Sequence, residues 1–112
     1  MEIIWISTNE FVTIGIKHYK KWDVLDGKSL KGSNGQFGKN CNILCSLAFD
    51  EDSKNIYAGA SDGSLQIWKG TSCTKSQKLH SGPIHALCIA ENRILTGSGD
   101  KTIKILNLSD LA

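Results

Sequence analysis

The chain has little of what marks several classes of protein. Among its 112 residues it holds one proline and one methionine. No apolar stretch approaches the roughly 18 residues that a membrane-spanning helix needs, so we expect no membrane partner. Residues 1–6 lack the basic start of a secretory signal, and the polar residues 7–10 end the apolar run early. These features predict a cytoplasmic protein.

The chain also lacks a strong charge of one sign. Lys and Arg number 13 against 11 Asp and Glu, giving a formal net charge of +2, and no basic block is present. We therefore expect no nucleic-acid partner, because such proteins carry clustered basic residues. Four cysteines without a secretory signal are typical of thiols in a reducing compartment.

Metal-ligand spacing is missing as well. Cys41 and Cys45 are four residues apart, which on an extended strand is about 13 Å, too far for two ligands of one zinc ion. No paired cysteines or histidine-rich segment follow at the spacing of a zinc finger. The sequence predicts neither a metal site nor a cofactor.

Glycine, in contrast, is plentiful at 11 residues, and it recurs at a fixed spacing. Residues 56–68 align without a gap to residues 94–106, and 38 residues separate Gly59 from Gly97. The segments just before them also match, with residues 50–55 forming a longer loop than residues 90–93. A weaker third copy occupies residues 11–22, with a shorter central turn that lacks an aspartate. Repeats of this length indicate a modular fold.

Within each copy, apolar and polar residues alternate with the period of two that predicts half-buried strands. Asp62-Gly63 lies between two such runs and predicts a hairpin turn. No sustained helical period is present. We predict eleven short strands, at residues 3–6, 11–16, 18–23, 29–31, 43–49, 55–60, 64–69, 76–79, 84–89, 93–98 and 102–108.

A period near 40 residues with short strands is typical of β-propeller blades. The predicted fold class is therefore all-β, a partial propeller of two to three four-stranded antiparallel blades in one domain. The blade-like units cover about residues 1–34, 40–79 and 80–112, and the last lacks its fourth strand. Because a propeller needs about 4–8 blades, the end blades should expose apolar faces. We expect either self-association or a piece of a longer chain.

Particular residues strengthen this interpretation. His80, Gly97 and Asp100, with the strand that follows, resemble a WD repeat, and Gly59, Asp62 and Trp68 resemble another. The resemblance implies a structural network of hydrogen bonds within each blade. It assigns His80, Thr96 and Asp100 to the third blade, with Leu106 at the tryptophan position. It assigns Asp62 and Trp68 to the second blade, with Asn40 at the histidine position.

A more specific resemblance covers most of the chain. Residues 11–22, 35–39, 43–49 and 80–88 are similar to the echinoderm microtubule-associated protein-like family. Membership would place the chain inside one of that family's two fused propellers. It would imply tubulin or microtubules as partners and a cytoskeletal location.

Two classes of function follow from these patterns. The favoured hypothesis is a non-catalytic scaffold for protein partners, since rigid frames present binding loops. The WD resemblance places candidate partner contacts at Ser61, Pro83, His85 and Gly99. The alternatives are a generic WD-repeat scaffold of another complex, or a propeller-fold hydrolase. An enzyme would need a convergent set of carboxylates, a nucleophile or a metal, and no such set is identified, so no catalytic residue is assigned.

Overall fold

The computed structural model describes residues 2–25, 29–37 and 43–111, which form strands and one short helix. The first four strands are β1 (Glu2–Ser7), β2 (Glu10–Gly15), β3 (His18–Leu25) and β4 (Ser29–Asn34). The next four are β5 (Leu44–Asp50), β6 (Asn55–Ala60), β7 (Ser64–Lys69) and β8 (Ser72–Lys78). The last elements are β9 (Ile84–Ala90), β10 (Arg93–Ser98), β11 (Ile103–Asn107) and the single helical turn α1 (Leu108–Leu111).

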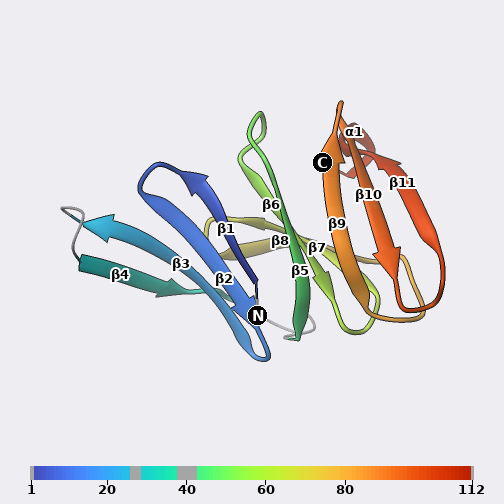
Figure 1. Cartoon of the computed structure of the whole chain (residues 1–112), viewed down its shortest axis with the longest axis horizontal. Coiled ribbons are helices and arrows are strands. Elements are labelled where there is room, and N and C mark those ends of the chain that lie inside the picture. Colours follow the sequence, from blue (N-terminus) through green and yellow to red (C-terminus); the bar gives the residue numbers. More distant parts are fainter. Residues whose placement is uncertain (1, 26–28, 38–42, 112) are drawn as a thin grey trace.

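These strands build three antiparallel sheets that stand side by side in chain order (Figure 1). Blade 1 comprises β1 to β4, blade 2 comprises β5 to β8, and blade 3 comprises β9 to β11. In each blade every strand pairs with its neighbour in sequence, so the blades are meanders. The first strand of blade 2, β5, contacts both β1 and β9, so the first strands lie together along one side. The predicted all-β fold of antiparallel blades is confirmed.

Most strands differ from the prediction by a residue or more at one or both ends, and three of these differences have a clear structural cause. The fourth strand of blade 2 begins at Ser72 instead of residue 76, because it pairs along the whole length of β7. In blade 1 the fourth strand continues to Asn34 for the same reason. The prediction of strand structure at Leu108 is wrong. The Leu108 N–H donates to the Asn92 carbonyl at 3.0 Å, and its side chain turns into the core at 5% exposure.

The blades are equivalent residue by residue in their second and third strands. Trp22 pairs with Phe11, Trp68 with Ile56 and Leu106 with Ile94. At the pair that lies two positions further along these strands, the register is again the same. It pairs Lys20 with Thr13, Gln66 with Ala58 and Lys104 with Thr96. A position in one blade therefore predicts the environment of its equivalent in the next.

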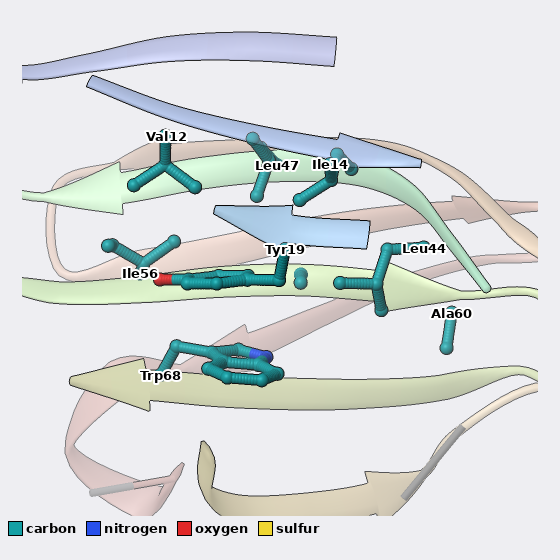
Figure 2. Packing of buried hydrophobic residues seen from close by; sticks show 9 residues of the cluster. Val12, Ile14, Tyr19, Leu44, Leu47, Ile56, Ala60 and Trp68 are labelled. Atoms are coloured by element: carbon teal, nitrogen blue, oxygen red, sulfur yellow. The ribbon is translucent and has the colours of Figure 1, made fainter. Parts of the chain in front are cut away.

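Blades 1 and 2 enclose the first core layer, which Figure 2 shows. Val12 and Ile14 from β2 and Tyr19 from β3 face Ile56 and Trp68 of blade 2. The rings of Tyr19 and Trp68 stack with centroids 3.9 Å apart. Burial raises the pKa of Tyr19 above its ordinary value, and its hydroxyl donates to the Gly70 carbonyl at 2.7 Å. The contact of these two rings joins the two blades.

Blades 2 and 3 enclose a second layer. Tyr57, Leu65 and Ile67 pack against Ile84 and Ile94 of blade 3, and all are nearly inaccessible to solvent. Since strand side chains alternate between faces, each blade has two apolar faces. We call the face directed at the preceding blade the leading face, exemplified by Trp68 and Ile56. The opposite face is the trailing face, exemplified by Tyr57 and Leu65.

No helix in the described part of the chain has the length and apolar character needed to cross a bilayer.

Candidate functional site

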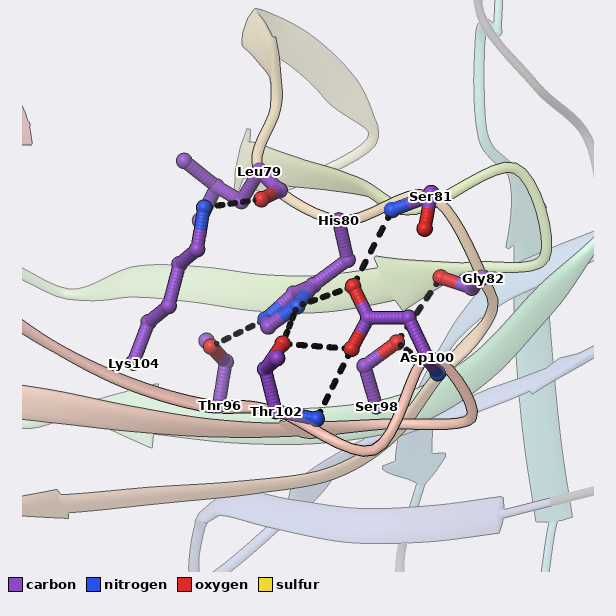
Figure 3. Close-up of polar contacts among 9 residues, drawn as sticks. All are labelled: Leu79, His80, Ser81, Gly82, Thr96, Ser98, Asp100, Thr102 and Lys104. Atoms are coloured by element: carbon purple, nitrogen blue, oxygen red, sulfur yellow. Dashed lines mark hydrogen bonds and ion pairs between the residues drawn. The ribbon is translucent and has the colours of Figure 1, made fainter.

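A histidine at the start of blade 3 is the centre of a polar network (Figure 3). The His80 side chain is fully inaccessible to solvent. Its Nδ1 lies 2.9 Å from the Thr102 hydroxyl and 3.1 Å from Asp100 Oδ2, and its Nε2 lies 2.8 Å from the Thr96 hydroxyl. The carboxylate favours the proton on Nδ1, so Nε2 accepts the hydrogen bond of Thr96. Each polar atom of the ring thus has a partner.

Asp100 binds two segments of blade 3 together. It accepts hydrogen bonds from the Thr102 hydroxyl, from the Thr102 N–H at 2.9 Å and from the Ser81 N–H at 3.2 Å. The Thr102 hydroxyl contributes most to holding the pKa of Asp100 well below its ordinary range, against a smaller opposing effect of desolvation. Hydrogen bonds from the backbone N–H groups of Thr102 and Ser81, and from His80, lower the pKa of Asp100 further. The carboxylate therefore stays charged and joins the β10–β11 turn to the chain entering β9.

The geometry of this network is that of a structural hydrogen-bond network, which holds segments of the blade together, and not that of a catalytic centre. Thr96, the hydroxyl next to His80, is fully buried and already bonded to the ring, so a substrate cannot reach it. Sequence analysis named His80, Thr96 and Asp100, which the structure brings together. It missed Thr102, whose signal is a hydroxyl residue two positions after the turn aspartate.

In blade 2 the indole N–H of the buried tryptophan has a different hydrogen-bond partner. Ala58 stands at the position of Thr96, so no hydroxyl is present there. Instead Trp68 Nε1 donates to Gln66 Oε1 at 2.9 Å, and both side chains are fully buried. Asp62 is exposed and accepts from the Ser64 N–H at 2.9 Å, so Asp62 and Trp68 belong to separate hydrogen bonds. Asn40 lies outside the described residues.

Blade 1 holds a third variant of the network, which sequence analysis missed. The Thr13 hydroxyl lies 2.7 Å from His18 Nε2 and accepts a hydrogen bond from Trp22 Nε1 at 3.0 Å. The histidine comes from the hairpin itself because the turn is short and Gly15 pairs directly with His18. The missed signal is a threonine and a tryptophan at the positions equivalent to Thr96 and Leu106.

The candidate partner contacts lie at one end of the blades, with Ser61 and Gly99 in hairpin turns, Pro83 just before β9 and His85 within β9. Ser61 and Gly99 occupy equivalent turns of blades 2 and 3, and Ile16 occupies that of blade 1. The Gly99 N–H donates to the Pro83 carbonyl at 2.9 Å, and the exposed ring of His85 lies close to Gly99. Pro83, His85 and Gly99 therefore form one cluster.

Ile43 extends this cluster toward blade 1. Its carbonyl accepts from the Ser61 N–H at 2.9 Å, and it forms a backbone bridge with Ile16. The side chains of Ile16 and Ile43 are 74% and 38% exposed. We call the row the rim; its members are Ile16, Ile43, Ser61, Pro83, His85 and Gly99. Sequence analysis missed the two isoleucines, because single exposed apolar residues are common on any protein surface and give no signal by themselves.

The described residues contain no group of three or more His, Cys, Asp or Glu side chains placed to hold a metal ion. Cys45, Cys73 and Cys88 form no disulfide with one another, and Cys41 lies outside the described part.

Three meander blades, with a hub in the last that joins the buried His80 to the partly exposed Asp100, define a segment of a WD-type β-propeller. The family model described as "WD domain, G-beta repeat" matches residues 29–69 and 71–107, and the chain belongs to this family. Each matched repeat starts in the fourth strand of one blade and continues through three strands of the next. One repeat therefore links two blades.

Two curated relatives are ciliary or flagellar by name. "Ciliary WD repeat-containing protein ctxp80" of Euplotoides octocarinatus is 32% identical over 101 residues, covering 88% of this chain and 14% of that protein. "Cilia- and flagella-associated protein 44" of Mus musculus is 26% identical over 108 residues, covering 88% of this chain and 6% of that protein. The chain thus spans a small part of the length of both.

Among solved structures, the WD40 β-propeller domain of Doa1 superposes with a TM-score of 0.79. The match covers 94% of this chain and 36% of that one, at 17% identity. This likeness shows the fold.

Proposed function

We propose that this chain is a non-catalytic interaction module of a cytoskeleton-associated WD-repeat protein. The observation that carries the proposal is the rim, a row of exposed and partly exposed residues at one end of the blades. Loops held by a stiff frame are where binding residues collect. The specific partner that we propose is tubulin, either free or in microtubules.

The rim has the properties of a binding surface. Backbone hydrogen bonds tie Ser61 to Ile43 and Gly99 to Pro83, so these turns are fixed before a partner arrives. Fixed turns reduce the conformational entropy that binding would cost. Exposed apolar side chains at Ile16 and Ile43 beside the imidazole of His85 offer both burial and hydrogen bonding. A row that mixes apolar and polar side chains in this way fits a protein surface as its ligand.

The polar networks support a non-catalytic role. The His80 ring of blade 3 is inaccessible to solvent, and both its nitrogens are occupied by Thr96, Thr102 and Asp100. An enzyme would expose such a pair to substrate. None of the six rim residues is a carboxylate.

Tubulin and a cytoskeletal, cytoplasmic location are supported by two resemblances. Residues 11–22, 35–39, 43–49 and 80–88 are similar to the echinoderm microtubule-associated protein-like family. Two relatives carry cilia or flagella in their names. A scaffold of another complex is the competing interpretation.

Co-sedimentation with microtubules, and capture of unpolymerised tubulin, tests the proposal. We expect the wild type to bind, and the double substitution Pro83→Ala with His85→Ala to weaken binding by at least about fivefold, the effect of a contact worth about 1 kcal/mol. Ile16→Asp should weaken it similarly. Glu51→Ala, in the exposed loop at the other end of blade 2, is the matched control and should bind as the wild type does.

Two results would contradict the proposal. If the wild-type protein binds neither microtubules nor tubulin, the proposed cytoskeletal partner is wrong. If the rim variants and Glu51→Ala lose equal amounts of binding, the rim is not the binding surface.

A further inference from the structure

We propose that a cavity between blades 1 and 2 binds a glutamate-rich segment of a protein partner. The cavity has a volume of about 280 Å³ and lies where the trailing face of blade 1 meets the leading face of blade 2. Both blades are described, so the site is built entirely from contacts seen in the structure. We call it the basic groove; the lining residues that matter to its chemistry are Ile6, Lys21, Phe49, Lys54, Ile56 and Lys69.

The basic groove lies at the end of the blades that is away from the rim. Lys54 directly precedes β6, and the rim residue Ser61 directly follows that strand. Lys69 is likewise the last residue of β7, a strand that begins three positions after Ser61. The groove is therefore a second surface, separate from the one that carries the proposed function.

Part of the lining is apolar. Ile6 of β1 and Phe49 of β5 are partly buried and pack against the core layer between the two blades. Ile56 of β6 belongs to that layer and is 1% exposed. Such a surface favours a ligand that brings methylene groups to cover it.

Three lysines from different elements line the same cavity. Lys21 lies on β3, Lys54 in the turn before β6 and Lys69 at the end of β7. Lys21 shares with Tyr19 the face of β3 that packs on blade 2, because side chains alternate along a strand. Among the described residues of the lining, Glu10 is the one carboxylate, so two positive charges are left unbalanced. The cavity therefore attracts an anion.

Glu10 shows how the basic groove holds a carboxylate. Its Oε2 lies 2.6 Å from Lys21 Nζ, and its Oε1 accepts a hydrogen bond from the Ser7 hydroxyl at 3.2 Å. Lys21 is thus already paired. Lys54 and Lys69 are both exposed, and neither forms an ion pair with another described residue. These two ammonium groups are the ones that a partner can engage.

The acidic loop beside Lys54 leaves the charge of the basic groove in place. Asp50 and Asp52 line a separate cavity, and Glu51 lines a third one. The Asp50 carboxylate accepts a hydrogen bond from the Ser53 hydroxyl at 2.7 Å. The loop therefore places its acidic side chains around other cavities.

Lys54 is held in position before any ligand arrives. Its φ of 61° lies in the left-handed region, and its N–H donates to the Asp50 carbonyl at 2.8 Å. Its ammonium lies 6.0 Å from the centroid of the Phe49 ring, over the apolar part of the lining. A turn fixed in this way reduces the conformational entropy that binding would cost.

This combination of charge and apolar surface favours glutamate over a simple inorganic anion. A glutamate side chain has two methylene groups before its carboxylate, so its stem can cover Ile6 and Phe49 while its charge meets an ammonium group. Inorganic phosphate has no apolar part and would gain nothing from that lining. Because Lys54 and Lys69 are both unpaired, a segment with several carboxylates gains more than a single residue does.

Fluorescence anisotropy of a labelled oligoglutamate peptide, with oligoglutamine of the same length as the neutral comparison, tests the basic groove. We expect the protein to bind oligoglutamate but not oligoglutamine. The affinity should fall at least about tenfold between about 50 mM and about 500 mM salt, because salt screens exposed charges.

The double substitution Lys54→Asn with Lys69→Gln should weaken oligoglutamate binding at low salt by at least about fivefold. Asparagine is chosen at position 54 because it tolerates a positive φ. Lys31→Gln with Lys78→Gln is the matched control, since it removes the same charge from exposed residues outside the groove. The control should bind within about twofold of the wild type, and circular dichroism of each variant verifies that the strands are retained.

Three results would overturn the proposal. The first is wild-type protein that does not bind oligoglutamate at low salt. The second is an equal loss in the groove variant and in the matched control, which would show a diffuse effect of net charge. The third is displacement of the peptide by inorganic phosphate at lower concentration than by glutamate. The rim is tested separately, because Ile16→Asp should bind oligoglutamate as the wild type does.

Discussion

The ring of Tyr19 lies flat on the indole of Trp68, with 3.9 Å between centroids and 12° between planes. One residue belongs to blade 1 and the other to blade 2, and 49 positions of sequence separate them. Phe37 meets the same indole edge-on at 5.3 Å, so three aromatic rings meet at this junction. The contact is the clearest link between the first two blades.

Trp68→Ala should therefore lower the free energy of unfolding by about 3–5 kcal/mol, the usual cost of removing a fully buried large aromatic side chain. Tyr19→Phe keeps the ring and removes only the hydroxyl that donates to Gly70, so about 0.5–1.5 kcal/mol is expected. Urea unfolding followed by circular dichroism measures both. Equal losses would show that the stacked ring is not what holds the junction.

Thr96→Val should destabilise the chain by about 1–3 kcal/mol, because the isosteric change leaves His80 Nε2 buried without its partner. Thr8→Val, in an exposed turn of blade 1, should change stability by less than about 0.5 kcal/mol. The same urea titration compares the two variants. A neutral Thr96→Val would mean that the hub does not depend on this hydroxyl.

Stability should fall on acidification, and Asp100 should account for part of the fall. Its pKa is lower in the folded chain than in the unfolded chain, mainly through the Thr102 hydroxyl. A carboxyl group whose pKa is lowered by folding stabilises the protein at pH values above its unfolded-state pKa of about 3.9. This contribution to stability is lost as the pH falls below that pKa. Asp100→Asn should flatten the acid limb of a plot of thermal midpoint against pH. An unchanged slope in the variant would contradict the assignment.

Gly59→Ala and Gly97→Ala should differ although the two residues are equivalent. A Cβ at Gly59 would overlap the Ser46 hydroxyl and lie 2.7 Å from Ile84, an overlap that typically costs about 1–3 kcal/mol. A Cβ at Gly97 meets Ala86 at the ordinary distance of 3.7 Å, so a change within about 0.5 kcal/mol is expected. Thermal unfolding of the two variants measures both changes. Similar losses at the two sites would show that the space beside Gly97 is not open.

Much of the fold could be predicted because strand patterns are local. Alternation of side chains placed β6, β7 and β10 at the predicted residues, and Asp62-Gly63 marked a turn in which Gly63 has a φ of 89°. The polar networks could be predicted only where the family pattern is intact, as at His80 and Asp100. Gln66 and His18 take over the hydrogen bonds of absent partners, and such substitutions depend on distances between strands.

Alternating side chains and a repeat of about 40 residues by themselves predicted an all-β chain of two to three blades, because the alternation expresses the two-residue period of an extended backbone and the repeat expresses the length of one blade. Tertiary structure alone decided which of their faces are covered. Trp22 and Trp68 share one position in the pattern, yet Trp68 is fully buried under blade 1 while Trp22 keeps part of its surface in solvent. A face of a blade is buried only when a second sheet packs against it. The alternation of residues along a strand does not indicate whether such a sheet is present.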